Sequence, residues 1–411
     1  MASMSIGAGN VILAPRLGAW GGYQVLWIIT FAFFTKGFIS YAATRYSLLS
    51  GENIMSCFFS IRPRGWINIL TLILCVVILP TIIATFITLL GQTMVWITGT
   101  GSYIVWGIGL SLAVALVGIM GTFKLLEKIQ LIFCLLLAVG AIIAIIVVNP
   151  PWLKIFLNLF NFRAIPRVPS WASAIDPELL TISVPLQLAA VYGTMCGTYL
   201  DFTAYIEWWR KKTDYKKKDL RFLGPLKIDI FLAFLIVSLF TLSFMVGGTI
   251  FLGKNKLLPT GMSLIKEQSR FYTIYHPAMK YIYQIAILVV IIGTLYTGMD
   301  GLPRMIRATL SPLSKKIKGM SFKKIQLLVV GYLLITSVPL VLLKISPILL
   351  ITIYLFSAGV IGFCVFGWGA LWANQRKLPR EKKFNKGMLI MMVGVNIILT
   401  FFVASIFLFP G

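Results

Sequence analysis

Long uninterrupted runs of apolar residues dominate this chain and restrict its fold more than any other feature. Four examples are residues 67–97, 129–148, 228–252 and 388–407. Each run exceeds the roughly 18 residues that suffice for a helix to cross the hydrocarbon of a bilayer. Backbone N–H and C=O groups in hydrocarbon must form hydrogen bonds with one another, which favours helices. The sequence therefore predicts an all-α protein that crosses the membrane several times.

The composition and the punctuation of the chain support this prediction. Of the 411 residues, 59% are hydrophobic and 12% are charged, whereas charged residues make up about a quarter of a soluble domain. Apolar runs bounded by Gly, Pro and charged residues predict a short piece at 10–20 followed by ten spans at 23–47, 66–97, 103–122, 126–149, 179–209, 227–252, 277–300, 325–344, 346–374 and 386–408.

The formal charge of +25 has a topological explanation. With these spans, 26 of the 37 Lys and Arg residues fall on the side reached by the end of the first full span, and 10 fall on the other. Such a bias marks the inner side of a membrane, so we expect contact with lipid and not with nucleic acid. The protein is predicted to be a multi-pass protein of a plasma or inner membrane, with its C-terminus outside.

Two spans are interrupted by glycine in the middle of apolar sequence. "GAGN" at Gly7–Asn10 opens the chain, and "YGTMCGTYLDF" at Tyr192–Phe202 opens the part that follows the connection 150–178. Glycine in a membrane helix can simply permit close packing. Two breaks at matching positions of two halves instead favour a transporter, in which open backbone at mid-depth holds the cargo. Gly7, Gly9, Gly193 and Gly197 are the predicted helix breaks.

The sequence around these breaks resembles the Nramp family of divalent-metal transporters. Ser5–Leu48 resembles the family's first two helices, with Gly7 to Asn10 aligned on its usual Asp-Pro-Gly-Asn motif. "GTFKLLEKIQ" and "LWANQRKLPR", residues 121–130 and 371–380, are similar to two further family segments, and "YGTMCGTYLDF" to its interrupted sixth helix.

The resemblance implies a LeuT-type fold of two inverted five-helix repeats plus an eleventh helix. The chain then divides into a first repeat at 1–149, an outer connection at 150–178, a second repeat at 179–375, and a basic inner loop with a final helix at 376–411. The half-helix that precedes the first break in the family is not found before Gly7.

The same resemblance implies a metal site. Asn10 would offer a side-chain oxygen, Tyr192 a backbone carbonyl and Met195 a thioether. Thioether sulfur favours Mn, Fe or Co over Mg and Ca. The family's metal-binding aspartate is Gly7 here, so Asp201 is the nearest carboxylate that could replace it, although lining an inner vestibule or pairing with a base would explain Asp201 as well.

Two other charged positions call for an interpretation. Lys36 lies half-way along its span, where we expect it to pair with a carboxylate or to face a cavity. Asp300 and Arg304 are spaced for an ion pair on one helix, although an inner gate could use the same two residues.

The leading prediction is a secondary transporter that moves a divalent cation, Mn-like or Fe-like or possibly Mg, by alternating access. Two alternatives stay open: a transporter of a small organic solute with the same fold, and a degenerate membrane protein that transports nothing. The sequence shows no nucleophile with a base beside it, no metal triad and no phosphate-binding loop, so we predict neither an enzyme nor a cofactor.

Overall fold

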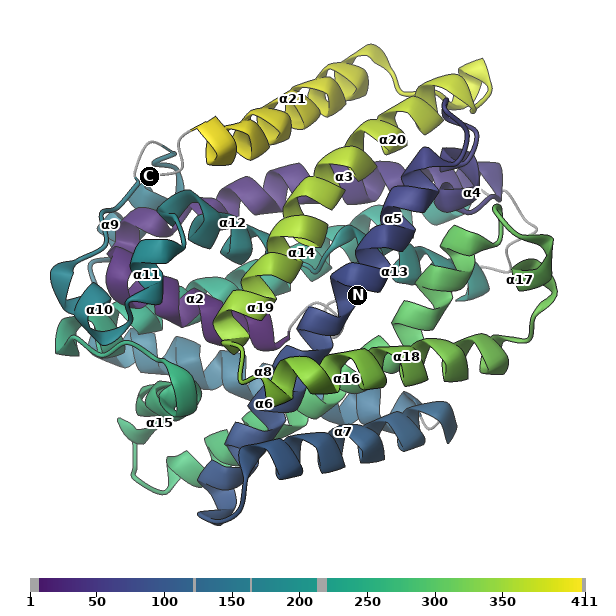
Figure 1. Cartoon of the computed structure of the whole chain (residues 1–411). Helices are drawn as coiled ribbons and strands as arrows, with labels where there is room; N and C mark the ends of the chain where they lie inside the picture. The colour runs from purple at the N-terminus through teal and green to yellow at the C-terminus, as the bar shows by residue number, and fades with distance from the viewer. Residues whose placement is uncertain (1–6, 121–122, 163–164, 213–219, 409–411) are drawn as a thin grey trace.

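The computed structural model describes residues 7–120, 123–162, 165–212 and 220–408, and within them it contains helices but no strand (Figure 1). The α-helices of the described residues are α2 (Ala8–Gly21), α3 (Trp27–Ser50), α4 (Ile54–Phe58), α5 (Trp66–Val77), α6 (Leu79–Thr98), α7 (Tyr103–Met120), α8 (Phe123–Val148), α9 (Trp152–Leu159), α10 (Ser170–Ile175), α11 (Glu178–Thr181), α12 (Val184–Thr194), α13 (Tyr199–Lys212), α14 (Leu223–Gly247), α15 (Arg270–Thr273), α16 (Met279–Leu310), α17 (Lys315–Gly319), α18 (Phe322–Leu342), α19 (Pro347–Tyr354), α20 (Gly362–Arg376) and α21 (Lys386–Leu408).

Seven of the described helices are long and apolar enough to cross a membrane, as predicted from the apolar runs. α2 and α3 form an eighth candidate, bent by 98° near Leu26. The predicted spans 126–149 and 179–209 correspond to α8 and to the pair α12 and α13. The prediction of an integral multi-pass helical protein is therefore confirmed.

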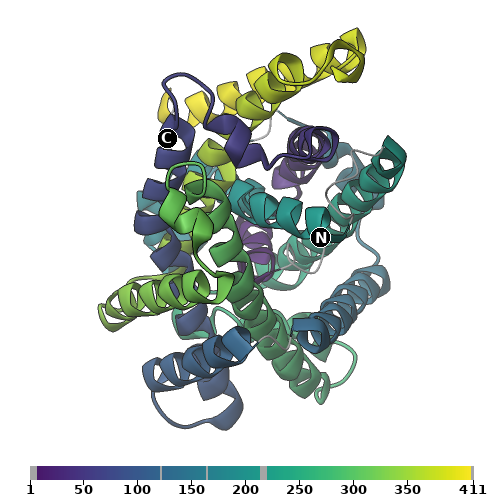
Figure 2. The same ribbon diagram turned by 90° about the vertical axis from the view of Figure 1, so that its right-hand side faces the viewer.

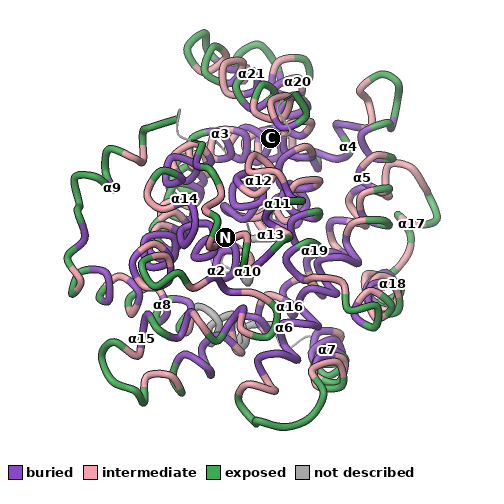
Figure 3. The backbone as a smooth tube through the Cα atoms, turned by 60° about the vertical axis from the view of Figure 1, so that its left-hand side comes forward, coloured by how far each residue is buried: buried purple, intermediate pink, exposed green. Residues whose placement is uncertain are grey.

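Burial separates the helices into a core and a rim (Figure 3). The most apolar window of α14 and its continuation is 67% buried, whereas that of α21 is only 22% buried. α21 lies beside α20 on one edge of the bundle, and α7 lies near the opposite edge (Figures 1 and 2). Because exposed apolar side chains on α7 and α21 have no protein to pack against, these helices present them to lipid.

The two ends of the bundle differ in composition. α9, α10, α11 and α15 gather at one end, on the left of Figure 1, and α4 and α17 lie at the other. We call the second the basic end, because the lysine-rich α17 lies there, as does the basic connection that follows α20. The connection 150–178, predicted as a loop, includes the helices α9 and α10.

Glycines let α2 approach α14 and its π-helical continuation, Gly248–Leu252. A Cβ atom on Gly18 would lie 2.0 Å from the carbonyl oxygen of Met245, and one on Gly248 would lie 2.1 Å from that of Pro15. No side chain fits at such distances. This contact fixes α2 in the core, and α2 begins near the centre of the molecule (Figure 1).

Candidate functional site

The second predicted break is present and lies between α12 and α13. Residues 195–198 are not helical, and two of them in succession, Cys196 and Gly197, have positive φ angles of 57° and 79°. Glycine adopts this conformation at little cost, but cysteine does so rarely. The break leaves the last carbonyl groups of α12 without helical partners at a depth where water is scarce.

The ammonium group of Lys36 on α3 donates hydrogen bonds to four backbone carbonyl oxygens at this break. Lys36 Nζ lies 3.2 Å from the carbonyl oxygen of Tyr192, 3.1 Å from that of Gly193, 2.8 Å from that of Met195 and 2.6 Å from that of Gly197. The Lys36 side chain is fully buried. Lys36 is not among the lining residues of the cavity described below, and backbone oxygen atoms hold its charge, whereas the Asp201 carboxylate interacts with it only through space.

The first predicted break differs from expectation. Gly7 is extended, with φ −136° and ψ −175°, but α2 begins at Ala8, so Gly9 and Asn10 lie in its first turn. The prediction that Gly7 to Asn10 is one unwound stretch is wrong beyond Gly7. The carbonyl oxygen of Gly7 accepts hydrogen bonds from the backbone N–H groups of Asn10 and Val11, which begins the helix at this point.

Asn10 joins the start of α2 to α12 and α14. Its buried side-chain amide donates to the hydroxyl of Thr241 at 2.9 Å and lies 3.4 Å from both the carbonyl and the hydroxyl oxygen of Thr194. The two predicted break regions, although 184 residues apart in the chain, therefore meet inside the bundle.

A cavity of about 100 Å³ lies where these elements meet. A buried water needs far less than this volume, so several waters or one partly hydrated ion fit. Its oxygen-bearing lining comes from α2, α12, α13, α16 and α19 and from the break: Asn10, Thr194, Thr198, Asp201, Thr294, Thr297 and Tyr354. The remaining lining is glycine and apolar side chains, including Ile82, Phe86 and Leu302.

Asp201 lies in the first turn of α13 and caps it. Its Oδ2 atom accepts a hydrogen bond from the backbone N–H of Thr198 at 2.7 Å and another from the Thr198 hydroxyl at 3.0 Å. The bond from the Thr198 N–H is one of the two bonds of a capping box, and it stabilises the helix start. Both bonds go to one oxygen, and Asp201 also lines the cavity. The carboxylate thus combines a structural role with access to the cavity.

The structure separates the four predicted metal ligands into two pairs. Asn10 and Asp201 line the cavity. Tyr192 and Met195 are not among its lining residues, and their carbonyl groups face Lys36 instead. In the described part of the chain, no group of three or more His, Cys, Asp or Glu side chains could hold a metal ion.

Three of the four glycines predicted as helix breaks line the cavity, and the fourth does not. Gly7, Gly9 and Gly197 line the cavity. Gly193 lies inside the helix α12, so it is not a break. A Cβ atom on Gly193 would lie 2.7 Å from Leu355 Cβ, in the π-helical segment Leu355–Ile361 that joins α19 to α20. The role of Gly193 is close packing.

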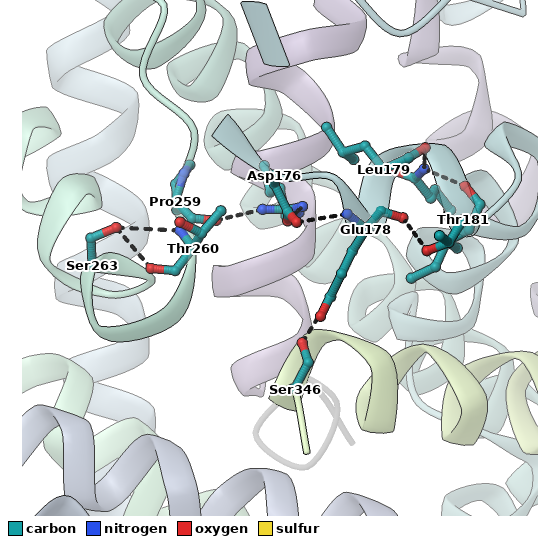
Figure 4. Close-up of polar contacts among 11 residues, drawn as sticks. Asp176, Glu178, Leu179, Thr181, Pro259, Thr260, Ser263 and Ser346 are labelled. Atoms are coloured by element: carbon teal, nitrogen blue, oxygen red, sulfur yellow. Dashed lines mark hydrogen bonds and ion pairs between the residues drawn. The ribbon is translucent and has the colours of Figure 1, made fainter. Parts of the chain in front are cut away.

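A second polar cluster lies at the α9–α11 end of the bundle (Figure 4). The guanidinium group of Arg16 on α2 forms an ion pair with Asp176 and donates to the carbonyl oxygen of Pro259 at 2.6 Å. Asp176 accepts from the backbone N–H of Glu178, whose carboxylate in turn accepts from the hydroxyl of Ser346 at 2.9 Å. We call Arg16, Asp176, Glu178, Pro259 and Ser346 the outer cluster.

The sequence analysis did not identify the outer cluster. One signal was available, because Asp176 and Glu178 are the only acidic residues in the connection 150–178. Arg16, six residues after Asn10 in an apolar stretch, is the cation that they face. A cavity of only about 20 Å³, lined in part by Arg16 and Glu178, lies beside the cluster.

Asp300 and Arg304 form the predicted ion pair on α16. Arg304 Nε and Nη2 donate to the two carboxylate oxygens of Asp300 at 2.8 and 2.7 Å, and the guanidinium group stacks on the Phe322 ring. Both partners belong to one helix, so the pair by itself bridges no gap between elements. A role as an inner gate stays a prediction.

Comparison with known proteins identifies the family. The family model described as "Natural resistance-associated macrophage protein-like" (Nramp) matches residues 1–409. The chain belongs to the Nramp family. The predicted membership is therefore confirmed, and with it the function class, a membrane transporter of divalent metal.

Solved structures support the predicted LeuT-type fold. A manganese transporter of Eremococcus coleocola, in complex with an aromatic bis-isothiourea compound, has 12% sequence identity and a TM-score of 0.66, with 98% of this chain and 84% of that chain covered. MhsT in complex with L-phenylalanine has 14% identity and a TM-score of 0.63, with coverage of 99% and 96%. A search of curated protein sequences found no match.

Proposed function

We propose that this Nramp protein carries a partly hydrated divalent cation through the cavity at the start of α2 and the α12–α13 break. One observation carries the proposal: Asp201 and Asn10, from the two halves of the sequence, line the same cavity. Alternating access between the repeats 1–149 and 179–375 would expose it to each side in turn. The metal is substrate, and the proposal involves no enzymatic step and no cofactor.

The donor groups at the cavity are oxygen atoms, which accept Mn and Mg alike. Asp201 supplies the negative charge that Gly7, at the family's aspartate position, does not. Met195 has a fully buried side chain outside the cavity lining. We therefore expect weak discrimination between Mn and Mg, unless Met195 turns toward the cavity at another stage of transport.

We also propose that the cavity is open toward the basic end of the bundle. We assign this end to the inside of the cell because of its positive charge. The cavity extends along α13 and α16 through Ala204, Gly301 and Leu302, in the direction of that end. The outer cluster closes the opposite path. This assignment gives a C-terminus outside, in a plasma or inner membrane.

The test is uptake of Mn, Fe, Co and Mg by proteoliposomes that contain the purified chain. We expect Asp201→Asn to lower uptake about tenfold or more, because contacts to a charged group contribute roughly 1.5–3 kcal/mol. Asp229→Asn is the control, since Asp229 bonds to Tyr205 and Trp209 away from the cavity and should leave uptake unchanged. Met195→Leu should leave the order of preference unchanged.

Uptake no faster than in empty vesicles for all four metals would refute the proposal. Stabilisation of the purified chain against heat by small organic carboxylates, with none by metals, would favour the alternative of an organic solute. A normal rate for Asp201→Asn would remove Asp201 from the site while leaving metal transport in place.

A further inference from the structure

The unwound turn between α12 and α13 has the chemistry of a cation site in its own right. Four carbonyl oxygens, from Tyr192, Gly193, Met195 and Gly197, converge on one point within 2.6–3.2 Å. Convergent backbone carbonyl groups are the groups with which proteins replace the hydration shell of a monovalent cation. We call these four carbonyl groups the carbonyl cage.

Two aromatic rings complete the surroundings of the carbonyl cage. The point occupied by Lys36 Nζ lies 5.1 Å from the centre of the Tyr192 ring and 4.8 Å from that of Phe363. Both distances are within the range of a cation–π interaction, which is strongest where water is excluded. Tyr192, Phe363 and Lys36 are all fully buried. Every group around this point therefore favours positive charge.

The backbone conformation explains why a cation is needed here. The Tyr192 carbonyl oxygen also accepts from the backbone N–H of Met195, and an ammonium group has three hydrogen atoms to donate to the oxygens that converge here. A buried carbonyl without a partner is costly, and four that point at one another also repel. The positive φ angles of Cys196 and Gly197 turn the backbone so that these oxygens converge.

We propose that the carbonyl cage is a monovalent-cation site which this chain fills with its own Lys36 ammonium group. The tethered charge takes the place of a free ion such as Na⁺ or K⁺, so the turn keeps its shape without one. The Lys36 ammonium group also donates to the Tyr192 carbonyl oxygen, which the family resemblance implies as a metal ligand. The inference concerns the cage alone and does not depend on metal transport.

The experiment empties the cage and offers free cations in its place. Lys36→Ala removes three methylene groups and the ammonium group, which together correspond to n-propylammonium. We expect this variant to lose about 3 °C or more in Tm in detergent without divalent metal, and n-propylammonium, K⁺ or Na⁺ to restore part of the loss. N-methylglucamine, which is too bulky for the cage, should restore none at equal ionic strength.

Three controls make the result specific. Neither the unaltered chain nor Lys36→Met, whose side chain fills the space without charge, should respond to n-propylammonium. Lys227→Ala should behave like the unaltered chain, because Lys227 lies over the Tyr41 ring in an exposed position. Lys36→Met should lose stability too, since it removes the ammonium donor from all four carbonyl groups and leaves the backbone N–H of Met195 as a donor to that of Tyr192 alone.

Two results with folded protein would overturn the inference, and a third applies if Lys36→Ala does not fold. One is a Lys36→Met variant as stable as the unaltered chain, since an ammonium group would then not be needed. The other is a response to n-propylammonium, Na⁺ and K⁺ that is the same in Lys36→Ala and the unaltered chain. If Lys36→Ala does not fold, its expression in 200 mM n-propylammonium is compared with that in N-methylglucamine, and equal failure in both also contradicts the proposal.

Discussion

Arg16 combines a full positive charge with deep burial, and its contacts account for both. Its side chain is 5% exposed, and that of its partner Asp176 is 10% exposed. The Arg16 guanidinium group also donates to the carbonyl oxygen of Pro259, so one side chain links α2 to two separate connections of the chain. The planar group with its five donors suits this task, and lysine would not replace it.

We expect Arg16→Gln to lower the stability by about 3–5 kcal/mol, because it leaves the Asp176 carboxylate buried without a counter-charge. The comparison is Arg270→Gln, which breaks an ion pair with Glu267 in which the arginine side chain is 54% exposed, and which should cost less than about 1 kcal/mol. Thermal unfolding of the purified variants measures both. Equal losses would show that burial of the Arg16 pair does not matter.

At the scale of helices, the contact between α2 and α14 depends on backbone lying directly against backbone. Gly18 and Gly248 leave room for the carbonyl oxygens of Met245 and Pro15, and the hydroxyl of Thr249 donates to the carbonyl oxygen of Gly18 at 2.9 Å. Small residues commonly permit such approaches in membrane proteins. The contact holds α2 where Asn10 meets the α12–α13 break.

We expect Gly248→Ala to destabilise the protein by about 1–3 kcal/mol or more, since its new methyl group must push α2 away. Gly109→Ala on α7 is the matched control, because a Cβ atom there meets nothing within 4 Å. It should leave the Tm unchanged or raise it slightly, as alanine favours helix over glycine. Metal uptake by the two variants should follow the same order. A stable Gly248→Ala variant would contradict the described helix contact.

At the scale of the whole molecule, the two ends of the bundle differ in how far they are closed. The outer cluster joins α2, α19 and two connections at one end. The cavity lined by Asn10 and Asp201 extends along α13 and α16 toward the other end. A molecule built in this way should admit small reagents to the cavity from the basic end alone.

Labelling of Gly298→Cys with a thiol reagent that does not cross membranes tests this asymmetry. Gly298 lines the cavity, a Cβ atom there would lie in ordinary contact with Leu302 Cδ1 at 3.8 Å, and four of the five natural cysteines are buried. We expect labelling from the basic end of oriented vesicles and several-fold less from the other. Adding Arg16→Gln and Asp176→Asn together should raise labelling from the end opposite the basic end. Equal labelling from both sides at the outset would contradict the closed outer cluster.

Much of the fold followed from the apolar runs, because helices in hydrocarbon satisfy their backbone groups locally and need no distant partner. The predicted spans at 66–97 and 386–408 agree closely with α5 plus α6 and with α21. Helix breaks were harder to locate. Gly193 and Gly197 look alike in sequence, but one packs against Leu355 and the other turns the chain with a φ of 79°.

The membrane class, the positions of most long helices and the uneven distribution of Lys and Arg could be predicted from the sequence, because these depend on length, hydropathy and local hydrogen bonding. Only the tertiary structure decided what each buried polar group contacts. Lys36 meets carbonyl groups more than 150 residues away, and Arg16 meets Asp176 across 160. Such pairs depend on how helices pack, and no local spacing in the chain records that packing.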